Sequence, residues 1–276
     1  MTMTHTYTKF SGAATASRSQ TSPRIESQPS RVRVRAVDLA VAFGGQQVLR
    51  GVDIDLTGGQ IALLRGPNGC GKTTLLNILS GFLEPDAGTA SLEFNGTTID
   101  ILTQTPDRLA RLGIARLWQD IRLFPTMTVL ENVLAASPHA IGINPAIALF
   151  ALGRVKRQER AFREQALAWL DMLGMADRAD SSGDMLSVGQ TKRVAIARIL
   201  QTGAQVLLLD EPLAGLDRDS AEKLVEDLNR LADATHKAML IVEHNHDAIT
   251  PVCDIRLTLE DGLLHREELE GKEWVC

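Results

Sequence analysis

One glycine-rich stretch, residues 66–74, constrains this chain strongly, because it fits the phosphate-binding pattern of Gly, four residues and Gly-Lys-Thr. The apolar run at 61–64 predicts a buried strand before it, and the run at 74–79 predicts a helix after it. Glycines let the backbone curl until successive N–H groups face an anion, and the helix N-terminus adds partial positive charge. We therefore predict a phosphate site made by Gly66, Pro67, Asn68, Gly69, Cys70, Gly71, Lys72, Thr73 and Thr74.

Two side chains of this loop have the chemistry that a nucleoside triphosphate requires. Lys72 can reach the β- and γ-phosphates, and the hydroxyl of Thr73 can coordinate Mg²⁺. A phosphate loop alone leaves kinases, GTPases, helicases and transporter ATPases open.

A pair of carboxylates narrows this choice. The apolar run at 206–209 predicts a second buried strand, and it ends in Asp210 and Glu211. An aspartate at the end of such a strand can hold Mg²⁺, directly or through water. A glutamate one residue later can polarise the water that attacks the γ-phosphate. This pair favours a nucleotide-hydrolysing enzyme.

The pattern of apolar residues predicts an α/β fold in which a helical insertion separates two α/β parts. Alternation over 31–43 and 48–56, around the turn at 44–45, predicts a β-hairpin, and residues 91–94 predict a further strand. Residues from about 105 to 182 are predicted to be mostly helical, with an amphipathic helix at 158–173. Later elements follow as helices at 187–200 and 219–231, a strand at 239–242 and a hairpin at 255–264.

Composition excludes several other classes of protein. The net charge of −5, with one Tyr, three Trp and seven Phe, argues against a surface for nucleic acid. Cys70, Cys253 and Cys276 form no disulfide framework, which favours a reducing cytosol. The apolar segment at 140–153 is too short to span a membrane. Residues 1–30 predict a disordered extension, and their basic, acid-poor composition leaves a transit peptide as the alternative.

A third motif follows the phosphate loop in the sequence and precedes the two carboxylates. Residues 186–190, Leu-Ser-Val-Gly-Gln, resemble the LSGGQ signature of ABC ATPases, and a basic and apolar run follows them. With the phosphate loop and the two carboxylates, residues from about 31 to 264 resemble the ATP-binding subunit of an ABC transporter. The resemblance implies a P-loop NTPase core with an antiparallel β subdomain and a helical subdomain, which together make one ATP-binding domain over 31–276.

The resemblance also implies roles for particular residues. The signature residues of one subunit would close on the γ-phosphate held by a second subunit; we expect Ser187 to cap a helix and Gly189 to expose its backbone. Asp210, Thr73 and Gln119 would hold Mg²⁺. The remaining implied roles are catalysis by Glu211, His244, Lys72 and Gln119, stacking of Phe43 on adenine, a contact of Ser187, Gly189 and Gln190 with ATP, and a dimer contact at Ala214–Asp217.

The sequence departs from the usual family pattern at three positions. Val188 replaces a signature glycine, Cys70 stands where Ala is common, and Phe43 replaces the usual Tyr.

Further marks resemble the ATPases of branched-chain amino acid and amide importers. They are Phe43-Gly44-Gly45, Arg122–Pro125 and the long helical segment at about 140–173. The resemblance implies ATP and Mg²⁺ as cofactors, a second ATP-binding subunit, the same or paralogous, and permease subunits that contact Gln119–Phe124. It places the chain in the cytoplasm, on the inner face of the cell membrane. The alternatives are the ATPase of a lipid exporter, a soluble ABC ATPase outside transport, and a regulatory subunit that does not hydrolyse ATP.

Overall fold

The computed structural model describes residues 32–138, 152–244 and 246–269. The predicted extension at 1–30 and most of the apolar segment at 140–153 lie outside the described residues. Within them, no helix combines the length and the apolar character that crossing a membrane requires.

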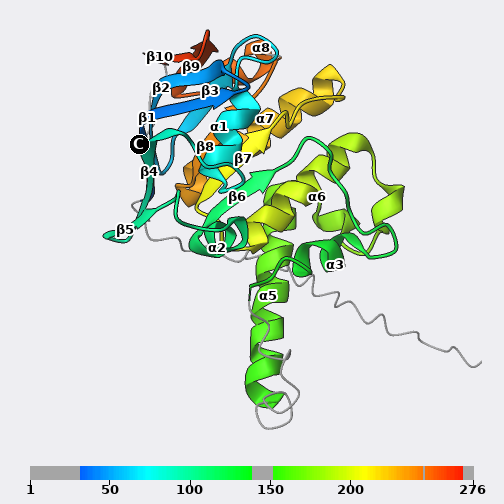
Figure 1. Ribbon diagram of the computed structural model, residues 1–276. Coiled ribbons are helices and arrows are strands. Elements are labelled where there is room, and N and C mark those ends of the chain that lie inside the picture. Colours follow the sequence, from blue (N-terminus) through cyan, green and yellow to red (C-terminus); the bar gives the residue numbers. More distant parts are fainter. Residues whose placement is uncertain (1–31, 139–151, 245, 270–276) are drawn as a thin grey trace, which may run out of the picture.

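A four-stranded antiparallel sheet forms one side of the molecule (Figure 1). It contains β1 (Val32–Phe43), β2 (Gln46–Thr57), β4 (Ala87–Phe94) and β5 (Thr97–Asp100), in the order β2-β1-β4-β5. The predicted hairpin is confirmed: β1 and β2 meet at a two-residue turn, where Gly44 and Gly45 have φ of 56° and 85°. Positive φ at both positions suits the turn type whose twist matches paired strands.

A six-stranded sheet in the order β10-β9-β3-β8-β7-β6 forms the centre of the fold. Its strands are β3 (Ile61–Arg65), β6 (Ile114–Leu117), β7 (Val206–Asp210), β8 (Ala238–Val242), β9 (Ile255–Glu260) and β10 (Leu263–Glu268). All neighbouring pairs are parallel except the terminal hairpin of β9 and β10. Because the strands are parallel, β3, β7 and β8 all end at one edge of the sheet, where ligands bind in folds of this kind.

Residues from about 105 to 182 were predicted to be mostly helical, but β6 within this region is a strand. Residues 114–117 are all buried and pair with β7, so they belong to the central sheet. Four residues with a buried arginine among them are too short and too polar for periodicity to indicate a strand. The helices of this region are α2 (Pro106–Leu112), α3 (Val129–Leu134) and α5 (Leu152–Met172).

Two apolar cores lie on opposite faces of the central sheet, because successive residues of a strand face opposite ways. Leu63 packs into the core that includes the helices α3, α5, α6 (Val188–Gln201) and α7 (Arg218–Thr235). Its neighbour Leu64 packs into the core shared with the antiparallel sheet and α1 (Lys72–Leu79). Short helical turns are η2 (Ala176–Arg178), η3 (Gly183–Met185), α8 (His246–Ile249) and η4 (Thr250–Val252).

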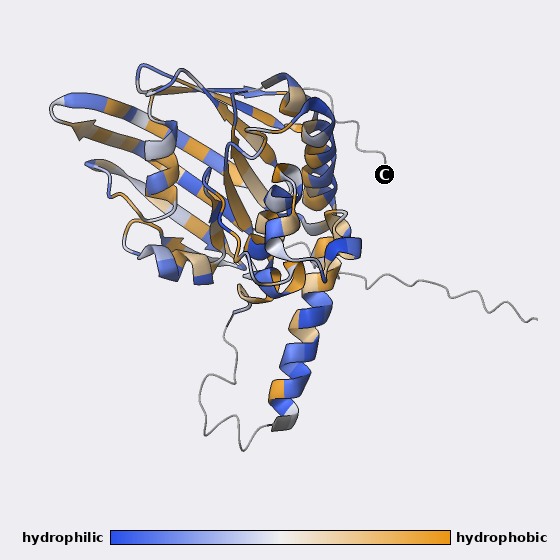
Figure 2. Cartoon of the chain, turned by 90° about the vertical axis from the view of Figure 1, so that its right-hand side faces the viewer, coloured by the Kyte–Doolittle hydropathy of each residue, from blue (hydrophilic) through white to orange (hydrophobic). Residues whose placement is uncertain are grey.

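Helix α5 leaves the body of the molecule along its N-terminal half (Figure 1). Its C-terminal half buries Ala166, Trp169 and Leu170 against the core, as the predicted apolar face requires. The projecting half is mostly hydrophilic, whereas apolar colour gathers on the strands and the inner helix faces (Figure 2).

Candidate active site

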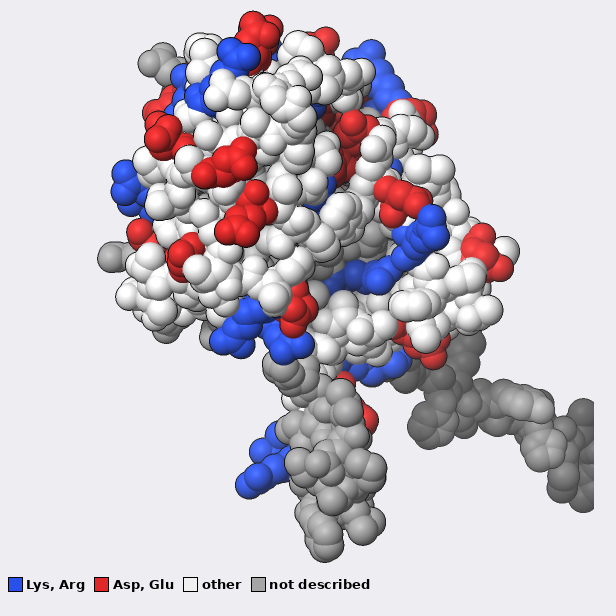
Figure 3. Space-filling view, viewed as in Figure 1, with Lys and Arg blue, Asp and Glu red and all other residues white. Residues whose placement is uncertain are grey.

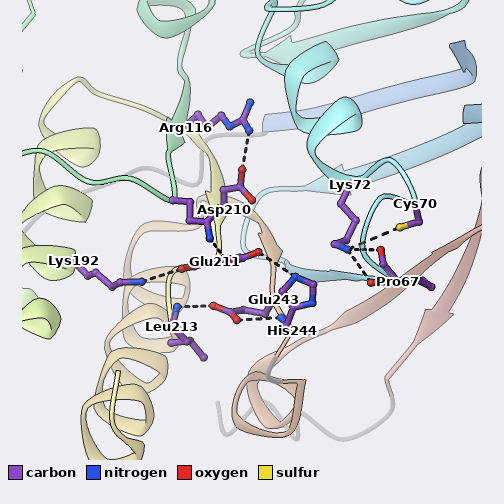
Figure 4. Close-up of polar contacts among 12 residues, drawn as sticks. Pro67, Cys70, Lys72, Arg116, Lys192, Asp210, Glu211, Leu213, Glu243 and His244 are labelled. Carbon is purple, nitrogen blue, oxygen red and sulfur yellow. Dashed lines mark hydrogen bonds and ion pairs between the residues drawn. The ribbon is translucent and has the colours of Figure 1, made fainter. Parts of the chain in front are cut away.

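The glycine-rich loop joins the end of β3 to the start of α1, as predicted. A Cβ added to Gly66, whose φ is 154°, would lie 2.1 Å from the carbonyl oxygen of Leu259, so no side chain fits there. The ammonium of Lys72 turns back over the loop and donates to the carbonyls of Gly66 at 2.8 Å and Pro67 at 2.9 Å (Figure 4). The loop therefore holds its lysine over the concave side, where an anion would meet it.

A cleft of about 350 Å³ opens in front of this loop. That volume falls in the usual range for small-molecule sites. The half-exposed ring of Phe43, at the end of β1, lies on its wall. The cleft brings together these predicted residues from separate parts of the chain: Phe43, Asn68, Gly69, Gly71, Lys72, Thr73, Thr74, Asp210, Glu211 and His244. Val48 and Val242 also line it, although the sequence analysis assigned them no role.

The carboxylate of Glu211 is held between two side chains from other elements. Its Oε1 lies 3.1 Å from Nε2 of His244, and its Oε2 accepts a hydrogen bond of 2.8 Å from Nε2 of Gln119. The backbone of Glu211 has φ of 49°, a left-handed conformation that is uncommon outside glycine. Such strain concentrates at functional sites, where the surroundings hold it in place.

Asp210 forms a buried ion pair that the sequence analysis missed. Nη2 of Arg116 lies 2.8 Å from Oδ2 of Asp210, and Nη1 of the same guanidinium donates to Oδ1 of Asn77 at 2.6 Å. Arg116 lies on β6, beside β7 in the sheet, so the unrecognised strand concealed this partner. The hydroxyl of Thr73 and the carboxylate of Asp210 fit the oxygen ligands of Mg²⁺, which usually takes one or two carboxylates together with substrate phosphates. Gln119, the third predicted ligand, contacts Glu211 in this structure.

Two further buried charged residues, Lys192 and Glu243, hold the backbone around Glu211 and His244. Glu243 accepts hydrogen bonds from the backbone N–H of Leu213 at 2.5 Å and of His244 at 3.2 Å. The ammonium of Lys192 donates to the backbone carbonyl of Glu211 at 3.0 Å. Burial raises the pKa of Glu243 and lowers the pKa of Lys192, because each loses water around its charge. Both residues stand beside predicted motifs in the sequence, but nothing in those motifs indicates their contacts.

The signature residues begin helix α6, at a distance from the cleft lining. Ser187 caps the helix as predicted, since its Oγ accepts from the N–H of Gln190 and the Gln190 side chain accepts from the N–H of Ser187. This reciprocal pair is a capping box. Among the described residues, Ser187, Gly189 and Gln190 are absent from the lining of the cleft.

The predicted exposure of the Gly189 backbone is wrong. Gly189 is buried, and a Cβ built on it would lie 3.6 Å from Cβ of Ser220 and 3.7 Å from Cδ2 of Leu216. Gly189 lies on the side of α6 that packs against Leu216 and Ser220, about 100° around the helix from Val188. Val188 takes the outward place and is 56% exposed.

A groove of about 370 Å³ lies between β6 and α6, and the face in Figure 3 is hollowed there, with basic side chains along the hollow. The segment from Asp120 to Arg122 forms one wall. Arg198 of α6 donates to the carbonyl of Arg122 at 2.7 Å and lies 5.5 Å from the ring centroid of Phe124. Helix α6 therefore touches the segment that follows Gln119.

A family model described as "ABC transporter" matches residues 49–214. The chain belongs to the ABC transporter family. The predicted P-loop NTPase core, with its antiparallel sheet and its helices, is confirmed as the fold of an ABC cassette.

Relatives of this ABC ATPase subunit include the high-affinity branched-chain amino acid transport ATP-binding protein BraF of Pseudomonas aeruginosa. It is 33% identical over 233 residues, which is 84% of this chain and 90% of BraF. Among solved structures, the ADP conformation of the ABC cassette MJ1267 is 31% identical, with a TM-score of 0.72 over 87% of this chain and 92% of that one. A dimeric post-hydrolysis state of the cassette MJ0796 with ADP and Pi is 25% identical, with a TM-score of 0.66 over 86% and 99%.

Proposed function

We propose that this subunit hydrolyses ATP in a dimer of ATP-binding subunits and so powers import through membrane permease subunits. The observation that carries the proposal is the Glu211 carboxylate, which lies between Gln119 and His244 at the cleft of the phosphate loop. A base held beside the phosphate site suits the activation of an attacking water.

Each group of the cleft has a task in this reaction. The amides of residues 66–74 and the ammonium of Lys72 bind the phosphates, and Phe43 stacks on the adenine. Glu211 orients the water, while His244 and Lys72 stabilise the negative charge that spreads over the γ-phosphate. Thr73, Asp210 and Gln119 would hold Mg²⁺, which neutralises phosphate charge when bound.

The position of the signature supports a second subunit, the same or paralogous. Ser187, Gly189 and Gln190 start α6 outside the lining of the chain's own cleft, so ATP bound there meets the signature of another subunit. The dimeric structure of MJ0796 with ADP and Pi supports the assembly of two such cassettes. The outward side chain of Val188 adds apolar surface to that contact.

The groove between β6 and α6 fits the permease contact, because Asp120, Ile121 and Arg122 of the expected segment line it. A permease that binds there meets the segment that begins at Gln119, whose amide contacts Glu211. Binding would also place the subunit at the cytoplasmic face of the membrane. The likeness to BraF favours branched-chain amino acids or related amides as the solute over a lipid, and it favours transport over a soluble role.

The hydrolysis is tested with the purified full chain and the variant Glu211→Gln. We expect ATP binding to remain and turnover to fall by about 10²- to 10⁴-fold, because the amide cannot take a proton from water. The matched control is Glu226→Gln, which changes an exposed acid of α7 in the same way. Undiminished turnover in Glu211→Gln would remove Glu211 as the catalytic carboxylate.

The transport role is tested by affinity purification of the tagged chain from detergent-solubilised membranes. We expect polytopic membrane proteins to co-purify with the wild type and to be lost with Ile121→Asp, whose charge would lie in the groove. Leu263→Asp, at an exposed position of β10, is the control. Recovery of soluble partners alone would favour an ABC ATPase outside transport.

A further inference from the structure

The backbone of Glu211 is held from three sides. Its N–H donates to the carbonyl of Val242 at 2.9 Å. Its carbonyl accepts from the N–H of Ala214 at 3.2 Å and from the ammonium of Lys192 at 3.0 Å. Of these three donors and acceptors, only the ammonium belongs to a side chain. Lys192 is 5% exposed, so this hydrogen bond is shielded from water.

The left-handed backbone of Glu211 makes such support necessary. A residue other than glycine loses roughly 1–2 kcal/mol in this conformation and keeps it only where neighbours determine it. Glu211 has φ of 49°, whereas Asp210, one residue earlier, is the last residue of a regular strand. The turn directs the carboxylate away from the strand and toward Gln119 and His244.

Glu243 extends the same support to the other side of the site. It accepts from the N–H of Leu213, two residues after Glu211, and from the N–H of His244. Lys192 is the cation that favours its buried charge. Figure 4 shows the resulting order, with Lys192 reaching the Glu211 backbone on one side and Glu243 joining Leu213 to His244 beside it.

We propose that Lys192 is a positioning residue for ATP hydrolysis, which fixes the Glu211 peptide so that its carboxylate faces Gln119 and His244. The inference rests on the proposed ATP hydrolysis. Lys192 is absent from the described lining of the cleft and donates to the carbonyl of Glu211, so it acts through Glu211. Lys192 also lies five residues after Ser187 on α6. The same helix therefore presents the signature to the nucleotide of the partner subunit and orients Glu211 at the nucleotide of its own cleft.

The test compares steady-state hydrolysis and ATP binding in the full chain. In Lys192→Met we expect kcat to fall by about 10- to 100-fold, because a small displacement of a reacting group costs rate of this order. The dissociation constant for ATP should stay within about twofold, since the loop is untouched. Lys192→Arg, which keeps a cation and a donor, should restore much of kcat.

A second variant separates positioning from neutralisation of the buried Glu243. If Lys192 only balances that charge, the double variant Lys192→Met with Glu243→Gln has the same kcat as Glu243→Gln alone, and the proposal is overturned. If Lys192 positions the peptide, kcat of the double variant stays below that of Glu243→Gln alone, although no buried carboxylate is left unpaired. The double variant also keeps the test valid if Lys192→Met alone does not fold.

The matched control is Arg193→Lys, one residue along α6, because Arg193 is also buried but pairs with Asp227 of α7 at 2.7 Å. It should change thermal stability while leaving kcat of the folded enzyme unchanged. An unchanged kcat in Lys192→Met, or parallel losses of kcat and ATP affinity, would refute the positioning role. Absence of hydrolysis in the wild type would instead refute the proposed function. Turnover that Glu211→Gln does not lower would refute it as well.

Discussion

Single residues of the site differ in how far the sequence could reveal them. Lys72, Asp210 and Glu211 stand in local patterns whose chemistry follows from spacing along the chain. Arg116 and Glu243 act through partners that are distant in sequence or through the backbone, which no local pattern encodes. The burial of Gly189 was missed for a related reason, because it depends on the packing of α6 against the start of α7.

Lys237 provides a prediction at the same scale. This lysine is 5% exposed; its ammonium donates to the carbonyl of Ala204 and lies 5.8 Å from the ring of Trp169. Burial lowers its pKa to about 8. Between pH 8 and the pKa of an unfolded lysine, roughly 10.4, the unfolded chain binds more protons, so the free energy of unfolding rises with pH. Below pH 8 both states are charged and the cost of burial is fully present.

We therefore expect the free energy of unfolding of the wild type to rise relative to that of Lys237→Met, by up to about 1.4 kcal/mol per pH unit above pH 8. Chemical denaturation at several pH values from 7 to 10 measures it. Lys223→Met, at an exposed position of α7, should show no such trend. A difference for Lys237→Met that is constant with pH would mean that burial does not lower the pKa of this lysine.

At the scale of elements, the hairpins and most helices could be predicted because their periodicity, caps and turns are local. Strand β6 could not, since its four residues become a strand only by pairing with β7. The segment after Gln119 shows the same dependence on distant contacts. It is held at its end by Asn132 of α3, a fully buried side chain that accepts from the N–H of Phe124 and donates to its carbonyl.

Asn132→Ala should loosen that segment. The substitution leaves the backbone groups of Phe124 without their partner, which costs about 1–3 kcal/mol. We expect lower thermal stability and weaker co-purification of permease subunits, with ATP binding retained. Asn229→Ala is the contrasting control, because within the described residues Oδ1 of Asn229 is buried without a hydrogen-bond partner. Equal effects of the two substitutions would remove the special role of Asn132.

For the whole molecule, the parallel strands gather the phosphate loop, the carboxylates and His244 at one edge of the central sheet. The signature starts a helix away from that cleft. On the proposed function, one chain therefore supplies two different halves of a nucleotide site. The first half was predictable because its motifs directly follow β3, β7 and β8, which are parallel strands of one sheet. On the proposed function, a partner chain supplies the second half, and no pattern within one chain describes that contact.

This division predicts a dimer that depends on ATP. Glu211→Gln with ATP and Mg²⁺ should accumulate as a dimer in light scattering, because bound ATP joins the two halves and is not consumed. Adding Val188→Glu should abolish the dimer while each chain still binds ATP, since an exposed carboxylate would face phosphate. Leu263→Glu, on exposed β10, is the control. A dimer that forms equally without ATP would contradict this assembly.

Helix α6 is capped by Ser187 at its start, contacts the Glu211 carbonyl through Lys192 and contacts the Arg122 carbonyl through Arg198. At 1.5 Å per residue, about 16 Å of stiff helix separates the first from the last. A helix of this length moves as a rigid body, so a shift at one of these residues also displaces the other two. On the proposed function, movement of α6 is therefore coupled to three sites at once. They are the ATP bound by the neighbouring subunit, the Glu211 carboxylate of this chain and the segment that contacts the permease. Hydrolysis then occurs only when all three sites are correctly placed, so a transporter without substrate would consume little ATP.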